Sequence, residues 1–211
     1  MILQEVKEKF FQSIDDELIS NGFKLVKSKD WYEKKQADCK LILFFQFHKR
    51  SEEIAIEAFC YIQHLETEKV YKTATKHAMS HTIGNEIGKL INNQGQGIQD
   101  HSSYELIIET DTDIANASNE IIRLYEAFIK SYFNENSNLN RIDSILNDFP
   151  DQINVHSNEQ FFRCPKGLIV AKLNGRENFQ ELEYKYDIKM AKVADLFKSR
   201  YEAVKEYLSS N

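Results

Sequence analysis

The first stretch of the chain carries an apolar side chain at every third or fourth position. The repeat runs through Leu3, Val6, Phe10, Ile14 and Leu18. Such spacing places the apolar side chains on one face of a helix, and Asn21-Gly22 is a typical helix stop. We therefore expect a helix over residues 2–20 with one face available for packing.

The pattern then changes to short segments rich in aromatic and β-branched residues, separated by two or three polar residues. These segments span residues 23–28, 31–36, 39–49 and 53–64. Connections this short favour hairpins, so the pattern predicts a four-stranded antiparallel meander. Leu41 to Phe45 is apolar at every position, which indicates a central strand covered on both faces. The first helix covers one face only, so a later segment or a second copy of the chain must cover the other.

Helical patterns dominate the rest of the chain, interrupted by one strand and one loop. We expect helices over 66–79, 114–132, 139–146, 168–173 and 197–208, a turn or short helix at 82–90, a flexible loop at 92–97 and a fifth strand at 104–110. Asp111, Thr112 or Asp113 is a candidate N-cap, and Asn178 with Glu181 forms a candidate capping box. The predicted class is α+β, with an N-terminal helix on a four- or five-stranded antiparallel meander. A break at 148–157 divides the chain into an α+β domain over residues 1–150 and a helical extension over 151–211.

Composition narrows the class of protein. Hydrophobic residues make up 42% of the chain and aromatic residues 12%, which is enough for a buried core. The longest apolar run, Leu41 to Phe45, is far too short to span a bilayer, and the charged N-terminal segment does not resemble a signal peptide. Cys39, Cys60 and Cys164 are widely spaced, so we expect buried, reduced thiols and a cytoplasmic location.

Charge is unevenly distributed along a chain whose net charge is -6. Residues 99–160 contain twelve acidic and three basic residues. Such a segment favours a basic protein partner, since complementary charge speeds association, although acidic helices are also a common way to keep a protein soluble. The candidate contact residues are Glu109, Asp111, Asp113, Glu120 and Glu126.

Residues 22–50 have the opposite bias, with eight basic and three acidic residues. The predicted hairpin 23–40 combines lysines with an adjacent pair of aromatic residues. Lysines contact phosphates and aromatic rings stack on bases, so single-stranded nucleic acid is an alternative ligand. Lysines also protect edge strands from aggregation, and the tryptophan could pack under the first helix. The candidate residues are Lys24, Lys27, Lys29, Trp31, Tyr32, Lys34 and Lys35.

Motifs for cofactors and metals are incomplete. The segment 84–90 has three residues between its glycines and Leu90 where a phosphate loop needs Ser or Thr, and Gly95-Gln-Gly97 lacks a third glycine. His77 and His81 would share a helix face as in zinc sites, with Glu86 or His101 as a third ligand, but the motif's glutamate is absent. Asp111 and Asp113 follow a strand, as metal ligands often do, yet a helix start explains them better. We expect no metal and no cofactor.

Catalytic pairs are equally weak. Glu57 could pair with His48 or His64 on a neighbouring strand, as chance pairs on any exposed sheet face do. Cys164 lies near Arg163 and Lys166, which would favour a thiolate, with His156 as the nearest histidine. An enzyme of unrecognised type would require Asp111, Asp113, Glu57 and the histidines to converge in one cleft.

A resemblance rests on the first half of the chain. The amphipathic helix is followed by Gly22-Phe23-Lys24, then by the strand with Trp31-Tyr32 and by the meander. This order resembles small bacterial domains of unknown function. The resemblance implies no activity and no catalytic residues, although some domains of this kind are immunity or defence-associated proteins. The leading hypothesis is thus a non-enzymatic protein-binding module that engages a protein partner or a second copy of itself.

Overall fold

The structure is a computed structural model that describes residues 2–93 and 104–210. Its elements in the first half are α1 (Leu3–Ser20), β1 (Lys24–Val26), β2 (Trp31–Gln36), β3 (Cys39–Lys49), β4 (Ile54–His64), α2 (Leu65–Thr75), β5 (Ile83–Glu86) and α3 (Ile87–Asn92). Those in the second half are β6 (Glu105–Ile108), α4 (Asp111–Leu124), α5 (Lys130–Asn136), α6 (Leu139–Asn147), α7 (Gln160–Leu173), α8 (Phe179–Met190) and α9 (Asp195–Ser210). The predicted α+β class is confirmed.

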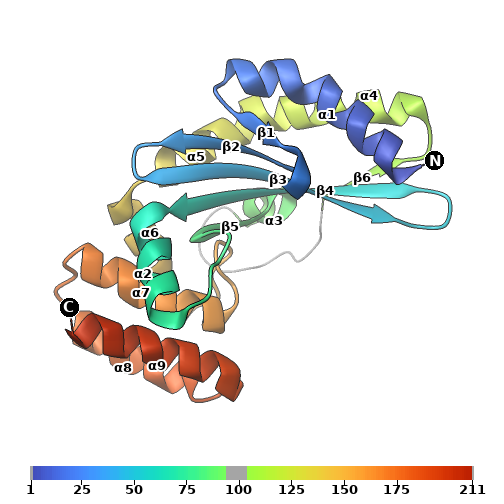
Figure 1. The fold of residues 1–211 in the computed structure, drawn as a ribbon. Coiled ribbons are helices and arrows are strands. Elements are labelled where there is room, and N and C mark those ends of the chain that lie inside the picture. Colours follow the sequence, from blue (N-terminus) through green and yellow to red (C-terminus); the bar gives the residue numbers. More distant parts are fainter. Residues whose placement is uncertain (1, 94–103, 211) are drawn as a thin grey trace.

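The sheet is an antiparallel meander in the order β1-β2-β3-β4-β5, seen in Figure 1. Strands β2 and β3 occupy the predicted residues, and β4 begins one residue later than expected. β1 is shorter than predicted, because residues 27–29 form a 3₁₀ turn that ends at Asp30 in a left-handed conformation. β6 pairs with the first residues of β4, beside β5 on the same edge of that strand.

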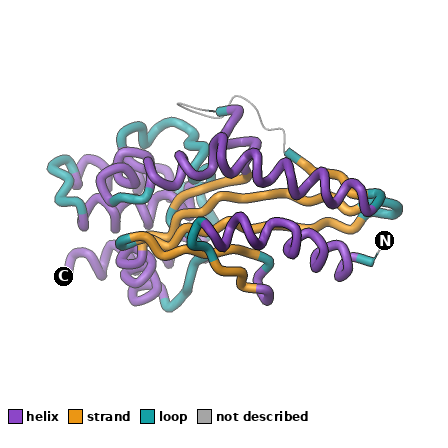
Figure 2. The backbone as a smooth tube through the Cα atoms, turned by 90° about the horizontal axis from the view of Figure 1, so that it is seen from above, coloured by secondary structure: helices purple, strands orange, loops and turns teal. Residues whose placement is uncertain are grey.

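One face of the sheet packs against helices, as Figures 1 and 2 show for α1 and α4. The predicted apolar residues of α1 are buried against the sheet, except Leu3, which is partly buried at the edge of the core. Phe10 is central: its ring meets that of Phe45 edge to face, with centroids 5.1 Å apart. Because side chains alternate along a strand, this face takes the odd-numbered residues of β3 and the even-numbered residues of β4. The remaining residues of both strands point to the opposite face.

The long helix after β6 is interrupted. α4 is followed by a π-helical segment, Tyr125–Ile129, and then by α5. The N-cap of α4 is Thr110, one residue before the first of the three predicted candidates. Asp113 accepts the backbone N–H of Thr110 at 2.8 Å, which is one half of a capping box. The two aspartates beside Thr112 therefore lie in the first turn of α4.

Two expectations for the middle of the chain need correction. α2 stops at Thr75 instead of residue 79, because Lys76 adopts a left-handed conformation that closes the helix. The short helix expected within 82–90 is present only from Ile87, as α3, because residues 83–86 form a strand, β5. Gly84 has a positive φ of 133° and lies under Tyr61, so a Cβ there would come within 2.0 Å of the Cys60 carbonyl oxygen. Of the predicted loop 92–97, the part beyond residue 93 lies outside the described residues.

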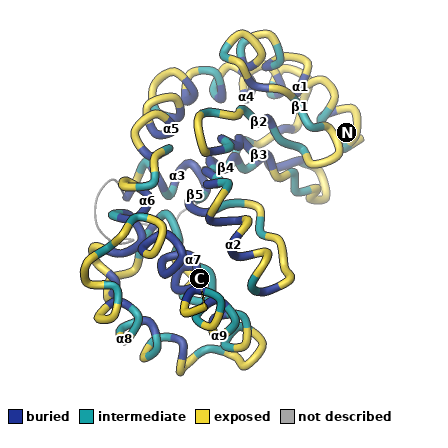
Figure 3. The backbone as a smooth tube through the Cα atoms, turned by 60° about the vertical axis from the view of Figure 1, so that its left-hand side comes forward, coloured by how far each residue is buried: buried dark blue, intermediate teal, exposed yellow. Residues whose placement is uncertain are grey.

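The C-terminal helices are longer than predicted. α7 begins at Gln160 instead of residue 168 and includes Pro165. Asn178 is the N-cap of α8, but its side chain makes no capping hydrogen bond, so the expected capping box is absent. A second hydrophobic cluster joins α7, α8 and α9 to Val70 and Tyr71 of α2. The dark blue inner sides of α2 and α7 in Figure 3 mark this packing. The helical end of the chain thus shares its core with an element from the first half.

Two buried cations on α7 join this helix to the rest of the molecule. Arg163 is fully buried and donates hydrogen bonds to the carbonyl groups of Leu146, Phe149 and Gln152 at the end of α6 and beyond. Lys166 is also buried and forms an ion pair with Glu68 of α2 at 3.2 Å. Among the described residues, no helix is long and apolar enough to cross a membrane.

Candidate functional site

The sheet face opposite α1 and α4 carries a band of aromatic side chains. Antiparallel register places Trp31 of β2 opposite Phe44 of β3, which in turn lies opposite Phe59 of β4. Tyr61 lies two residues farther along β4, so it shares this face. All four side chains are partly exposed. In Figure 1, α1 and α4 lie on the other side of the sheet, and α2 and the C-terminal helices lie beyond the end of β4.

The rings lie close to one another at small angles. The centroids of Phe44 and Phe59 are 5.5 Å apart, and those of Phe59 and Tyr61 are 5.7 Å apart with planes 25° from parallel. His81, from the segment between α2 and β5, stacks on Tyr61 at 3.9 Å and 10°. Burial and the charge of Lys166 lower the pKa of His81 to about 3, so its ring is neutral at pH 7. The band is therefore an uncharged aromatic surface that ends at His81.

Trp31 lies at the β2 end of the band and has an unused donor. Its indole N–H is buried and has no hydrogen-bond partner within the described structure. The ammonium group of Lys29 lies over the indole ring, 4.4 Å from the centroid. A ligand that displaces Lys29 would reach both the face of the ring and the cation beside it.

Basic side chains border the same face. Lys24 and Lys40 share one carboxylate, that of Glu33, at 3.2 Å and 3.4 Å. Burial raises the pKa of Glu33, but its contacts with the two lysines outweigh burial, so the pKa is lowered overall and the group is ionised at pH 7. Lys35 is exposed at the end of β2, on the same face as Glu33. Together with Lys29, this places four lysines beside the aromatic band, two of which share the carboxylate of Glu33.

The predicted basic hairpin is divided between the two faces of the sheet. Trp31, Lys24, Lys29 and Lys35 lie at the open face. Tyr32 does not: it is fully buried, and its hydroxyl donates to Asp15 of α1 at 2.5 Å, so its expected role in stacking on bases is wrong. Lys34 donates to the carbonyl group of Asn21, and Lys27 borders a pocket beside α1. The alternation of Trp31 and Tyr32 along β2 could have predicted this division, because adjacent residues in a strand face opposite ways.

The opposite end of the open face is less basic. His48 pairs with Glu57 at 2.9 Å, which is one of the two expected pairings. The alternative pairing with His64 does not occur, because His64 lies on the covered face and contacts Thr67. Arg50 binds Glu105 at 2.7 Å. Positive charge on this face is therefore concentrated around β1 and β2.

The five predicted acidic contact residues lie in the turn after β6, on α4 and in the π segment, and most have intramolecular partners. Asp111 pairs with Lys9 of α1 at 2.8 Å, and Asp113 caps α4. Glu120 pairs with Arg123 at 2.7 Å and Glu126 with Lys130 at 3.2 Å. Glu109 is exposed in the turn before α4.

Other acidic residues of this segment are neutralised by cations from distant parts of the chain. Asp143 and Asp148 both pair with Arg176, and Glu105 pairs with Arg50. The fold thus offsets much of the charge that the sequence concentrates in residues 99–160. The positive charges of the lysines at β1 and β2 are neutralised less completely by acidic partners.

The structure does not give His77 and His81 the arrangement of the candidate metal site. Both residues follow the end of α2, so they do not share a helix face, and His81 is stacked on Tyr61. His101 lies outside the described residues. Within residues 2–93 and 104–210, no three His, Cys, Asp or Glu side chains lie close enough to hold a metal ion.

The cysteine hypothesis is also wrong. Burial raises the pKa of Cys164 to about 12, outweighing the nearby charge of Arg163, so the thiol is protonated at pH 7. His156 is bound to Tyr132 instead. All three cysteines are free and buried, as expected. Asp111, Asp113 and Glu57 are each held by a different partner, Lys9, Thr110 and His48, so these three carboxylates do not converge within the described part of the chain.

Sequence reasoning missed Phe44, Phe59 and Tyr61 as members of the band, and it considered His81 only as a metal ligand. The first three could have been found from strand alternation, once Trp31 was aligned with its neighbours across the meander. His81 could not, because its stacking depends on the path of the chain after α2. Comparison of the chain with family models, curated proteins and solved structures finds no match, so function has to be inferred from the geometry of the molecule.

Proposed function

We propose that this protein binds single-stranded nucleic acid on the open face of its sheet, through the aromatic band of Trp31, Phe44, Phe59 and Tyr61. The observation that carries the proposal is the alignment of these rings beside lysines that share one carboxylate. Aromatic rings stack on bases of any sequence, and lysines contact the phosphates. The expected ligand is a short, unpaired strand bound with little sequence preference.

The first test uses the chain's own fluorescence. Trp31 is the only tryptophan in the sequence, so its emission reports on the band alone. An oligothymidylate should quench this emission at low salt. The affinity should then fall as salt rises, with a logarithmic slope of about -0.7 for each phosphate contacted.

Paired variants separate stacking from general affinity. Phe44→Leu removes a ring from the band and should weaken binding of a labelled oligonucleotide by about 5- to 150-fold, the value of one base stack. Phe149→Leu is the matched control, because Phe149 is exposed but lies on the loop after α6. Unchanged binding in Phe44→Leu, or an equal loss in both variants, would contradict the proposal.

Charge reversal supplies a second pair. Lys35→Glu should weaken binding and reduce the salt slope by about 0.7, since it removes a phosphate contact. Lys130→Glu is the control, because Lys130 lies on α5 at the covered side of the molecule and is exposed. If the open face instead forms a dimer, oligonucleotide should not quench Trp31. Analytical ultracentrifugation should then detect a dimer in the wild type that is lost in Phe44→Leu.

The acidic side of α4 supports a second proposal, that a basic protein binds there. Tyr104 is 41% exposed and donates to Glu120 at 2.5 Å, so an aromatic ring lies beside the carboxylates. Aromatic residues are enriched in protein interfaces, and acidic residues steer basic partners to them. A pull-down from the native host at low and physiological salt tests it, with the wild type and Tyr104→Ser as baits. Equal recovery of a basic partner by both baits would rule out this surface.

A further inference from the structure

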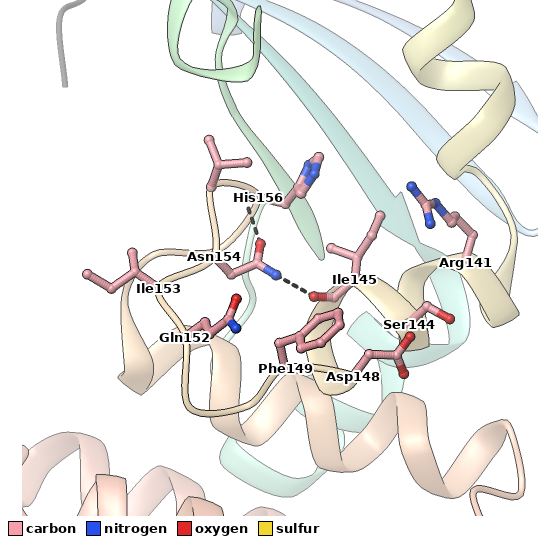
Figure 4. A pocket seen from close by; sticks show the side chains of 10 residues that line it. Arg141, Ser144, Ile145, Asp148, Phe149, Gln152, Ile153, Asn154 and His156 are labelled. Carbon is pink, nitrogen blue, oxygen red and sulfur yellow. Dashed lines mark hydrogen bonds between the residues drawn. The ribbon is translucent and has the colours of Figure 1, made fainter. Parts of the chain in front are cut away.

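A pocket separate from the sheet face lies between α6 and the segment before α7, shown in Figure 4. Its cavity of ≈ 220 Å³ adjoins a second of ≈ 370 Å³ that reaches α5 and the π segment. Arg141 and His156 line both cavities. These two side chains therefore stand where the cavities meet.

Arg141 is exposed at the mouth of the pocket and has no acidic partner in the described chain. Its side-chain Nε–H donates to Asn136 at 3.1 Å, and its backbone N–H donates to the N-cap Asn138. The carboxylates in the walls of the two cavities have other partners: Asp148 binds Arg176 at 2.6 Å, and Glu135 accepts the hydroxyl of Ser131 at 2.7 Å. Figure 4 shows the guanidinium of Arg141 turned toward the imidazole of His156. Its two terminal nitrogens are thus available to a ligand.

His156 is held by contacts on two sides. Its backbone carbonyl accepts the N–H of Gly84 at 2.9 Å, and its backbone N–H donates to Asn154 at 2.8 Å. Its Nδ1 lies 3.0 Å from the hydroxyl of Tyr132. Burial raises the pKa of Tyr132 well above its ordinary value, so this hydroxyl keeps its proton and is able to donate it to Nδ1. With the hydroxyl as donor, the proton of the neutral imidazole resides on Nε2.

The neutral state of His156 follows from the same surroundings. Burial and the positive charge of Arg141 lower the pKa of His156 to about 4. At pH 7 the pocket therefore offers one guanidinium and one neutral N–H donor. Ser144 also lines the first cavity, one helical turn from Arg141 on α6.

We propose that this pocket binds the phosphate group of a small metabolite between Arg141 and the Nε2–H of His156, with Ser144 as a further donor. A guanidinium without an acidic partner is suited to a bidentate contact with an oxyanion. The cavities are small, so the organic part of the ligand is compact. The π segment contributes Phe128 to the wall, and π segments are frequent at functional sites.

Calorimetric titration of the whole chain with inorganic phosphate, phenyl phosphate and acetate tests the proposal. Phenyl phosphate should bind more tightly than inorganic phosphate if the cavities hold the organic part, and acetate should bind most weakly. Equal binding of the two phosphate compounds would assign the site to free phosphate and overturn a metabolite ligand. Absence of binding for both would overturn the site itself.

A pair of arginine variants locates the site. Arg141→Met should weaken phenyl phosphate binding about tenfold or more, because it removes a charged contact. Arg123→Met is the control, since Arg123 is an exposed arginine on α4. An equal loss in both variants, or no loss in Arg141→Met, would show that the anion is not held by Arg141. A thermal shift caused by phenyl phosphate in the wild type and absent in Arg141→Met supplies a second readout.

Discussion

The buried ion pair between Lys166 and Glu68 links α7 to α2, and its removal should destabilise the whole fold. The two side chains are 1% and 8% exposed, and the nitrogen lies 3.2 Å from a carboxylate oxygen. Lys166 also donates to the carbonyl group of His81, while Glu68 accepts the hydroxyl of Thr82 at 2.8 Å. The second oxygen of Glu68 has no hydrogen-bond partner in the described structure. Lys166→Met would leave that carboxylate buried with only one donor.

The expected loss of unfolding free energy is about 3–5 kcal/mol, the usual effect of breaking a buried pair from one side. Burial raises the pKa of Glu68 and lowers the pKa of Lys166, so each group depends on the other for its charge. Replacing both groups by apolar side chains removes the unpaired charge. The double variant Glu68→Leu/Lys166→Met should therefore recover most of the loss.

Urea unfolding followed by circular dichroism measures both effects. Lys198→Met is the matched control, because Lys198 forms an ion pair with Asp195, whose side chain is 98% exposed. That variant should change stability by less than about 1 kcal/mol. If Lys166→Met were no more destabilising than Lys198→Met, or if the double variant were as unstable as the single one, the argument that burial controls this pair would be refuted.

Three further predictions concern stability at acid pH, the backbone at Gly84 and the carbonyl groups bound by Arg163. The pKa values of His81 and His156 are lowered to about 3 and about 4, so below pH 6.5 the native state binds fewer protons than the unfolded chain. The free energy of unfolding should therefore fall from pH 6.5 toward pH 4, by up to about 1.4 kcal/mol per pH unit for each histidine. Thermal melts over this range measure the slope, and Gln at either position should reduce it. Gly84→Ala should lower the melting temperature, since the new Cβ would lie 2.0 Å from a carbonyl oxygen at a positive φ; a melt equal to wild type would contradict this. Arg163→Met should cost about 3–5 kcal/mol in urea unfolding, because three carbonyl groups lose a charged donor, and a loss below 1 kcal/mol would show that water replaces it.

The first half of the fold could be predicted from sequence because its signals are local. The apolar repeat of α1 and the short polar breaks between strands each depend on a few neighbouring residues. β5 was missed because Gly84 is a poor strand residue that is accepted here only beneath the ring of Tyr61. The start of α7 was missed because Pro165, normally a helix breaker, lies within the helix. These errors arise where tertiary contacts override local preference.

The candidate sites were less accessible to prediction. The acidic surface was inferred from charge counted along the sequence, whereas Asp111 and Asp143 meet Lys9 and Arg176 from distant segments. Trp31 was identified as a candidate, but its neighbours in the band come from other strands. The Arg141 pocket has no sequence motif, because its walls come from α5, α6 and the segment that precedes α7.

The double pairing of β4 bears on how the chain can be shortened. Residues Ile54–Glu57 are paired on one edge with β3 and on the other with β6, which follows much later in the sequence. A fragment that ends before β6 would leave this hydrophobic edge with free N–H and C=O groups, which readily capture strands of other molecules. Fragments of the N-terminal half are therefore expected to aggregate, and nascent chains on the ribosome remain vulnerable until residue 108 has emerged.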